Sequence, residues 1–449
     1  MTGTSNPRAA ISPGSRASSR SSIRASGRPS PSRRPTRPDA GARLQARCNV
    51  RPGVVARATT NPATRHSSRE DRRTAPIRRG LMARITQIGL RRLKLPLIRP
   101  YRLSYRTFTE FEPFLVTVAD DAGRTGFADA HVSPGSSRET REGGWAFCRA
   151  RIEEILGEET GAAKTAVLAR FEESKVAATA LVAAIEVLED NPQLEVPETA
   201  ELPLLTPING LTEAEIGPEI EDWLAKGFRT FKVKVGKDVA ADLARVRTIQ
   251  KAIAGRATFR LDANRAYDRS AGIAFASALD PEGIELFEQP CDSDDWEANA
   301  AVAAASAVPL MLDEPICTLA DIARAGAIAN VRFCKLKLKR FGGLDRLREG
   351  LDAVRAAGME PVLGDGLGSE IHNWLEACVA RSTIRNAGEF NGFIKPRERL
   401  LSPPLPFANG SIILPAGYRP RPDWTLIDRF TAERLDFTTT KARTATHGA

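Results

Sequence analysis

The chain has 449 residues, enough to bury a sizeable core, and its length favours two domains. No apolar run approaches the roughly 20 residues that a membrane helix needs, so we expect a soluble, cytoplasmic protein. The net charge of +10 comes from one end of the chain. Residues 1–80 contain 18 arginines, no lysine and three acidic residues, a net +15, so the remaining residues carry −5. A mildly acidic folded part argues against nucleic acid as its partner.

Residues 1–81 are rich in Arg, Ser, Pro, Thr and Ala and lack a periodic apolar pattern, which predicts a disordered tail. Three explanations of the tail stay open. Met82 stands directly before the first strand-like run, as expected if the true start lies there. The Arg-rich, acid-poor composition also suits an organellar transit peptide, which would place the protein in an organelle. The third explanation is a nucleic-acid-binding arm.

The six cysteines form no CxxC pair, so reduced thiols of the cytosolic type are expected. The four histidines are too scattered along the chain to predict a histidine metal site.

Residues 82–202 predict an α+β domain. Apolar and polar residues alternate over 83–135 as in a β-meander, with a DDAG turn between two of its strands. Three helical patterns follow at 139–156, 162–172 and 175–188. A meander followed by helices is typical of a separate domain, and the pattern changes near Pro203.

Short apolar runs alternate with helical patterns over residues 203–399. The runs are residues 204–208, TFKVKV, TFRLDA, IELFEQ, PLMLDE, FCKLKL and EPVLGD, and a weaker candidate at 383–390 makes eight. The helices predicted between them include 211–225, with Thr212 as its N-cap, 239–254, 319–329 and 344–357. This repetition predicts a (β/α)8 barrel with its active site at the carboxyl ends of the strands. An open doubly wound sheet is the alternative, although LTPINGLTE lacks the GxGxxG of that fold. Residues 400–449 are predicted to pack on the first domain, with a disordered end.

Five charged residues stand at the ends of predicted strands. Lys234, Asp262, Glu288, Asp313 and Lys337 follow one another at intervals of 28, 26, 25 and 24 residues. One strand, one helix and two loops take about that length. The spacing therefore predicts that the five side chains face one mouth.

Three of these residues, Asp262, Glu288 and Asp313, are carboxylates with no His or Cys among them. Such a hard-oxygen set suits Mg²⁺ or Mn²⁺, with positions left open for water or substrate. Asn264 shares a strand face with Asp262 and Glu314 follows Asp313, so both are assigned to the surroundings of the metal. A single acid at a strand end is more often a helix cap or a member of an ion pair, and it is the three at regular spacing that favour a metal site.

The lysines at the same strand ends suggest acid/base chemistry. Lys232 and Lys234 share one face of their strand, where desolvation and a nearby cation would lower both pKa values from about 10.4 toward the range of a general base. Lys337 would lie across the mouth, so that a proton could be removed and returned on either face of an α-carbon. Lys335 and Lys339 share the face of Lys337. Amphipathic edge strands with solvated lysines are the alternative explanation.

At these residues the chain resembles the enolase superfamily, and within it the mandelate racemase/muconate lactonizing enzyme subgroup, over roughly residues 84–415. The motifs are Lys232-Val233-Lys234, Asp262-Ala263-Asn264, Glu288-Gln289-Pro290, Asp313-Glu314-Pro315, and Lys337 five residues before Gly342-Gly343. The resemblance implies a capping domain on a barrel and Mg²⁺ bound by the three carboxylates. It implies Lys234 and Lys337 as the two acid/base groups and Lys232 as the residue that tunes the electrostatics. It also implies a small-molecule carboxylate substrate and a homo-oligomer.

The chain departs from the subgroup near the seventh strand, where GDGLGSEIH replaces the usual sequence with its acidic residue. Asp365 and Glu370 are the nearby candidates for a substrate contact. In the capping domain, RPYRLSYRT at 99–107 is expected to close over the mouth, with Tyr101, Tyr105 and Arg106 as candidate contacts. These three residues also fit an ordinary surface strand.

The motifs predict a Mg²⁺-dependent enzyme that abstracts the proton α to a carboxylate. Two opposed lysines favour racemisation or epimerisation, for example of an amino-acid derivative or dipeptide. Cycloisomerisation, succinylbenzoate-synthase-type elimination and sugar-acid dehydration use the same groups and stay open. A function of another class is a catalytically idle relative that binds a carboxylate, with the tail engaging nucleic acid. The intact lysines and carboxylates argue against it.

Overall fold

The computed structural model describes residues 83–102, 106–134 and 138–439. The predictions for the tail at 1–81, for Tyr105 and for the C-terminal end lie outside these ranges. Within them, no helix has both the length and the apolar character needed to cross a membrane.

The larger sheet consists of seven parallel strands that lie side by side in chain order, β7 to β13. Their bounds are β7 Thr206–Ile208, β8 Thr230–Lys234, β9 Thr258–Asp262, β10 Ile284–Glu288, β11 Leu310–Leu312, β12 Val331–Leu336 and β13 Glu360–Leu363. These strands are short and apolar because both faces of the sheet are covered. Side chains on them, such as Val233, Leu261 and Phe287, have no exposed surface.

Residues 388 and 389 complete the barrel. The N–H of Glu389 donates to the carbonyl of Leu363 at 2.9 Å, and the N–H of Leu205 donates to the carbonyl of Gly388 at 3.0 Å. A parallel bridge joins Leu204 to Gly388. The strand predicted at 383–390 is therefore only a short bridge, because helix α11 extends to Thr383. The α/β barrel predicted from the sequence is confirmed, with seven regular strands and this bridge in the eighth position.

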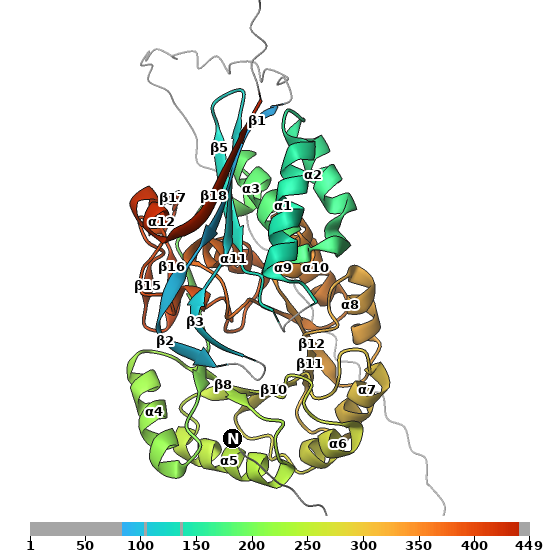
Figure 1. Ribbon diagram of the computed structural model, residues 1–449. Helices are drawn as coiled ribbons and strands as arrows, with labels where there is room; N and C mark the ends of the chain where they lie inside the picture. Colours follow the sequence, from blue (N-terminus) through green and yellow to red (C-terminus); the bar gives the residue numbers. More distant parts are fainter. Residues whose placement is uncertain (1–82, 103–105, 135–137, 440–449) are drawn as a thin grey trace, which may run out of the picture. The chain divides into compact units, whose positions relative to one another are not determined.

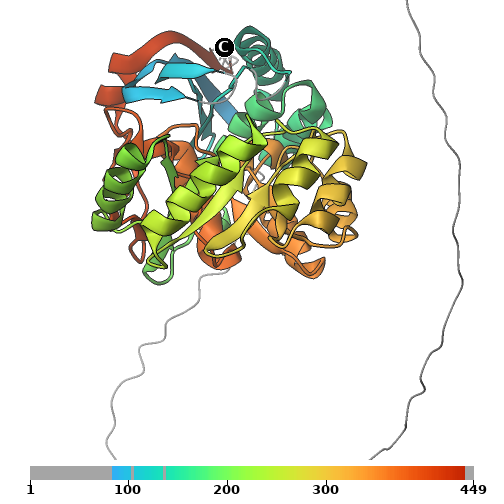
Figure 2. The ribbon, with the colours of Figure 1, turned by 90° about the horizontal axis from the view of Figure 1, so that it is seen from below.

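Helices follow the strands and lie along their outer side (Figures 1 and 2). Their bounds are α4 Glu213–Ala225, α5 Val239–Ile253, α6 Arg269–Ser277, α7 Trp296–Ala305, α8 Leu319–Gly326, α9 Leu338–Phe341, α10 Leu344–Ala356 and α11 Glu370–Thr383. Thr212 is the N-cap of α4 as predicted, and its N–H donates to Glu215 at 3.1 Å. Reciprocal caps at α4 and α8 fix where these two helices begin.

The N-terminal region forms an antiparallel sheet in the order β18-β1-β4-β5. Its strands are β1 Ile85–Leu93, β4 Phe114–Asp120, β5 Thr125–Ala130 and β18 Thr431–Thr438, with helices α1 Arg141–Ile155, α2 Thr160–Ala169 and α3 Lys175–Leu188 beside it. The last described strand of the chain thus pairs with the first. The hairpin β2 Leu95–Arg102 and β3 Thr107–Phe111 lies apart from this sheet. The remaining elements are the strands β6 Ala200–Pro203, β14 Leu401–Ser402, β15 Phe407–Ala408, β16 Ser411–Leu414 and β17 Arg421–Pro422, helix α12 Trp424–Phe430, and the 3-10 helices η1 Phe171–Glu173, η2 Pro192–Leu194 and η3 Gly392–Ile394.

Helix α3 of the capping region holds the turn between α9 and α10. Glu186 of α3 accepts hydrogen bonds from the N–H groups of Leu344 at 2.6 Å and Asp345 at 3.3 Å. Gly342 and Gly343 in this turn have φ values of 80° and 145°. A Cβ on Gly343 would lie 2.8 Å from a carboxylate oxygen of Glu186. Positive φ and close packing together require the glycine pair.

The hairpin is tied to the barrel side of the chain. The N–H of Ile98 donates to the carbonyl of Lys395, and the N–H of Arg397 donates to the carbonyl of Pro96, both at 2.9 Å. β2 is therefore hydrogen-bonded to the segment that follows the eighth strand position.

Candidate active site

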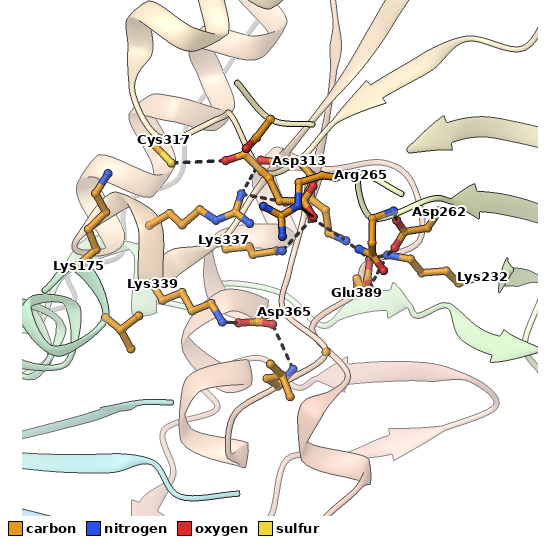
Figure 3. Close-up of a pocket in the computed structure, with 18 of the residues that line it drawn as sticks. Lys175, Lys232, Asp262, Arg265, Asp313, Cys317, Lys337, Lys339, Asp365 and Glu389 are labelled. Atoms are coloured by element: carbon orange, nitrogen blue, oxygen red, sulfur yellow. Dashed lines mark hydrogen bonds and ion pairs between the residues drawn. The ribbon is translucent and has the colours of Figure 1, made fainter. Parts of the chain in front are cut away.

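A cavity of about 760 Å³ lies at the carboxyl ends of the barrel strands (Figure 3). Lys234, Asp262, Asp313 and Lys337 line it, as the spacing predicted. Lys234 and Asp262 end β8 and β9 and are paired in register, and Glu288 at the end of β10 pairs with Asp262. Asp313 and Lys337 directly follow β11 and β12. Glu288 is not among the lining residues.

Lys234 lies on one side of this cavity, against Asp262. Its ammonium contacts Asp262 Oδ2 and lies 2.5 Å from Asn264 Oδ1. The N–H of Asn264 donates to Asp262 Oδ1 at 2.9 Å, so the asparagine fixes both groups. Burial alone would raise the pKa of Asp262, but Lys232 and Lys234 lower it to about 2. The carboxylate is therefore ionised.

Lys337 lies against Asp313. Its ammonium is 2.9 Å from Asp313 Oδ2, and Arg340 Nη1 is 2.9 Å from Asp313 Oδ1. Burial, followed by the charge of Arg340, lowers the pKa of Lys337. That direction is the one required of a lysine that accepts a proton near neutral pH.

Lys232 is a buried cation with three carboxylate partners. Its ammonium lies 2.8 Å from Asp262 Oδ2, from Glu288 Oε2 and from Glu389 Oε1. Burial alone would lower the pKa of Lys232, but these three charges raise it well above its usual value. The prediction of a lowered pKa is therefore wrong for Lys232, because the sequence did not show how many acids surround it. Lys232 stays charged and cannot act as a base.

Glu389 is a site residue that sequence reasoning missed. It contacts Lys232 and Lys335 and lines the cavity from the eighth strand position. A two-residue bridge leaves no alternating apolar pattern, so no strand end marked this acid. The spacing could have found it, since Asp365 follows Lys337 by 28 residues and Glu389 follows Asp365 by 24.

Lys335 is also buried among the acids. Its ammonium is 3.0 Å from Glu288 Oε1, contacts Glu389 Oε2, and lies 3.9 Å from Asp313 Oδ2. Burial alone would lower the pKa of Lys335, but Glu288 and Glu389 raise it. Glu288 thus has one ammonium group at each oxygen.

The donor atoms of Asp262, Glu288 and Asp313 suit a hard divalent cation by type. Glu288 Oε2 accepts no hydrogen bond from the described residues and is paired with Lys232 at 2.8 Å. In the described part of the chain, no three Asp, Glu, His or Cys side chains are grouped so as to hold a metal ion. Lys232 joins the oxygens of Asp262 and Glu288, and Lys335 lies between Glu288 and Asp313, at 3.0 and 3.9 Å. The residues fit Mg²⁺ by chemistry, and its binding stays a prediction.

Strained backbone follows two of the carboxylates. Asn264, Arg265 and Gln289 have φ values of 46°, 68° and 38°. Left-handed residues other than glycine concentrate at functional sites. The side chain of Gln289 accepts from the N–H of Asp313 at 3.0 Å and so sets the position of that acid. Glu314 lines the cavity, with its Oε1 atom 3.7 Å from Arg265 Nε.

The structure separates the predicted substrate contacts. Tyr101 and Asp365 line the cavity, and Asp365 is paired with Lys339 (Figure 3). Arg106 does not line it, and its guanidinium lies 5.3 Å from the ring centre of Phe108.

Glu370 also does not line the cavity, so its prediction as a substrate contact is corrected. It is 2% exposed and accepts from Arg399 Nε and from the N–H groups of Leu401 and Leu405, each at 2.8 Å. These bonds hold the C-terminal segment, because α11 begins at Glu370 and turns its carboxylate away from the strand ends.

Comparisons with known proteins agree with this fold. Residues 215–420 match the family described as enolase C-terminal domain-like. The chain is 26% identical to L-Ala-D/L-Glu epimerase of Bacillus subtilis, over 69% of this chain and 87% of that protein. It is 29% identical to muconate cycloisomerase 1 of Rhodococcus opacus, over 72% of this chain and 92% of that protein. Its fold matches the crystal structure of N-succinyl Arg/Lys racemase from Bacillus cereus with a TM-score of 0.73 and 19% identity, over 79% and 100% of the two chains.

Proposed function

We propose that this chain, which belongs to the mandelate racemase/muconate lactonizing enzyme subgroup of the enolase superfamily, removes the proton α to the carboxylate of a small-molecule substrate. The observation that carries the proposal is the placement of two lysines on different carboxylates of one cavity. Lys234 of β8 contacts Asp262, and Lys337 after β12 contacts Asp313. Three strands separate them in the sheet, so they approach the cavity from opposite sides.

The two lysines would divide the proton transfers. Lys337, whose pKa is lowered, takes the proton from one face of the α-carbon. Lys234, whose side chain is 42% exposed, gives a proton to the other face. In the reverse direction the two exchange tasks, so either enantiomer can serve as substrate.

The charges around the cavity suit the anion that forms when the proton leaves. Lys232 is held as a permanent cation beside Asp262 and stabilises negative charge on the substrate carboxylate. Mg²⁺ or Mn²⁺ held by Asp262, Glu288 and Asp313 would supply the larger part of that stabilisation. Gln289 and Arg340 keep Asp313 in position, through its N–H and its Oδ1 atom.

Racemisation or epimerisation of an amino-acid derivative or dipeptide is the favoured outcome, because each face of the α-carbon would have its own lysine. Epimerase and racemase are also the activities in the names of two of the relatives above. Cycloisomerisation is the second candidate, since the Rhodococcus relative is named a muconate cycloisomerase.

Proton NMR in D₂O with Mg²⁺ and pooled dipeptides, N-acyl amino acids, hydroxy acids and sugar acids tests the proposal. Loss of an α-proton signal is expected, with deuterium in both enantiomers for a racemase and a new vinyl signal for an elimination. Lys337→Ala should abolish exchange of one enantiomer and Lys234→Ala exchange of the other. Lys251→Ala, at a side chain that is 79% exposed, is the control. Equal residual exchange of both enantiomers in either site variant would contradict the two-lysine mechanism.

A further inference from the structure

Glu288 is enclosed by two ammonium groups. Lys232 Nζ lies 2.8 Å from its Oε2 atom and Lys335 Nζ lies 3.0 Å from its Oε1 atom. Glu288 is 1% exposed and does not line the cavity, whereas both lysines do. The two lysines therefore stand between this carboxylate and anything that enters the cavity.

Lys335 differs from Lys232, Lys234 and Lys337 because the proposed reaction gives it no task. Lys234 and Lys337 are assigned to the proton transfers, and Lys232 to charge stabilisation. Lys335 is 2% exposed and has two close partners, Glu288 and Glu389. Burying a charge without partners is costly. The buried ammonium group of Lys335 and its two carboxylate partners are therefore expected to compensate each other's charge.

We propose that Lys335 is an internal counter-ion of Glu288 which a divalent cation must displace, and that Lys335 and Glu389 together set the metal affinity of the site. The inference rests on the proposed function, because it takes Asp262, Glu288 and Asp313 as the metal-binding carboxylates. Before a cation binds, Lys335 compensates the buried charge of Glu288. When Glu288 turns to the cation, Lys335 keeps Glu389 as its partner, since the two are already in contact.

Binding of Mn²⁺ alone to the metal-stripped protein tests this competition, with free Mn²⁺ measured by electron paramagnetic resonance. Lys335→Met keeps the length of the side chain and removes its charge, while Glu288 and Glu389 keep Lys232. The dissociation constant should fall by about tenfold or more, because a buried positive charge close to a dication opposes its binding. Lys339→Met is the matched control, since Lys339 pairs with Asp365, and its effect should be clearly smaller.

Glu389→Gln should change the affinity in the opposite direction. Lys335 then has Glu288 as its one close carboxylate, so the dissociation constant should rise. The double variant Lys335→Met/Glu389→Gln restores the charge balance and should bind Mn²⁺ nearly as the wild type does. General damage to the site would instead weaken binding in all three variants, and the double variant covers the case in which a single variant does not fold.

An unchanged or weaker affinity in Lys335→Met, or an equal gain in Lys339→Met, would overturn the inference while leaving the proposed function intact. If neither the wild type nor Lys335→Met binds Mn²⁺, the metal dependence of the proposed function fails, and the inference fails with it. If only Lys335→Met binds, and Asp262→Asn in that background abolishes the binding, the counter-ion is established in its strongest form.

Discussion

Glu186 of helix α3 in the capping region is hydrogen-bonded to the start of helix α10. Its ionisation should make the stability of the protein depend on pH. It is 3% exposed and accepts hydrogen bonds from Leu344 and Asp345. Burial raises its pKa to about 7 from the ordinary 4.5, against a smaller lowering by these bonds. The folded chain therefore holds this proton more tightly than the unfolded chain. The resulting stability is fully present below pH 4.5 and is lost as the pH rises through 7.

Glu186→Gln removes this titration. A pKa difference of the stated size corresponds to about 3 kcal/mol, so the free energy of unfolding of the variant relative to wild type should rise by about that amount between pH 4.5 and pH 8. At the acid end the variant should be less stable by about 1 kcal/mol, because the amide NH₂ faces one backbone N–H group, whereas the hydroxyl oxygen of the protonated carboxyl group can still accept from it.

Urea unfolding at several pH values measures this difference. Glu213→Gln, at a side chain that is 76% exposed, is the control and should show no trend. A difference between Glu186→Gln and wild type that does not vary with pH would refute the reasoning, because every other titrating group is common to the two proteins.

Three further predictions concern the cavity and the turn beside it. Asp262→Asn should weaken Mn²⁺ binding by more than about tenfold while the protein still folds, although the loss of a buried partner of Lys232 and Lys234 lowers its melting temperature, and unaltered metal dependence would remove Asp262 from the site. Gly343→Ala should lower the free energy of unfolding by more than about 1 kcal/mol, because φ is 145° and the new Cβ would meet Glu186, and a neutral effect in urea unfolding would contradict the tight turn. Lys395→Met should raise KM more than it lowers kcat, because Lys395 lines the cavity beside Tyr101, with its ammonium 4.6 Å from the ring centre. A loss confined to kcat would instead assign Lys395 to the chemical step.

The sequence was sufficient to predict the barrel and to place the charged residues that end or directly follow β8, β9, β11 and β12 at the cavity. A parallel strand must be followed by a helix before the next strand, so each unit has nearly constant length and puts its last residue at the same edge. That constraint brought Lys234 and Asp262 into register and Asp313 and Lys337 to the ends of their strands. Glu370 was mistaken for a cavity residue because a helix start turns side chains in directions that strand alternation does not describe.

The three lysines of KLKLK show where sequence reasoning stopped. Alternation places Lys335, Lys337 and Lys339 on one face, but β12 ends at Leu336, and Lys339 belongs to helix α9. Their electrostatic states then follow from residues distant in sequence. Glu389 is 54 positions from Lys335 and contributes to its raised pKa.

Burial and Arg340 lower the pKa of Lys337, whereas Lys339 is paired with Asp365. Lys335 and Lys337, two positions apart, are thus proposed as a counter-ion and as a candidate base. The difference lies in which acids the closed barrel brings to each ammonium group. A charge-reversing change at Glu389 should therefore affect the charge state of Lys335 more than that of Lys337, because the close carboxylate of Lys337 is Asp313. Metal affinity would then respond to Glu389 more strongly than proton exchange at the Lys337 face.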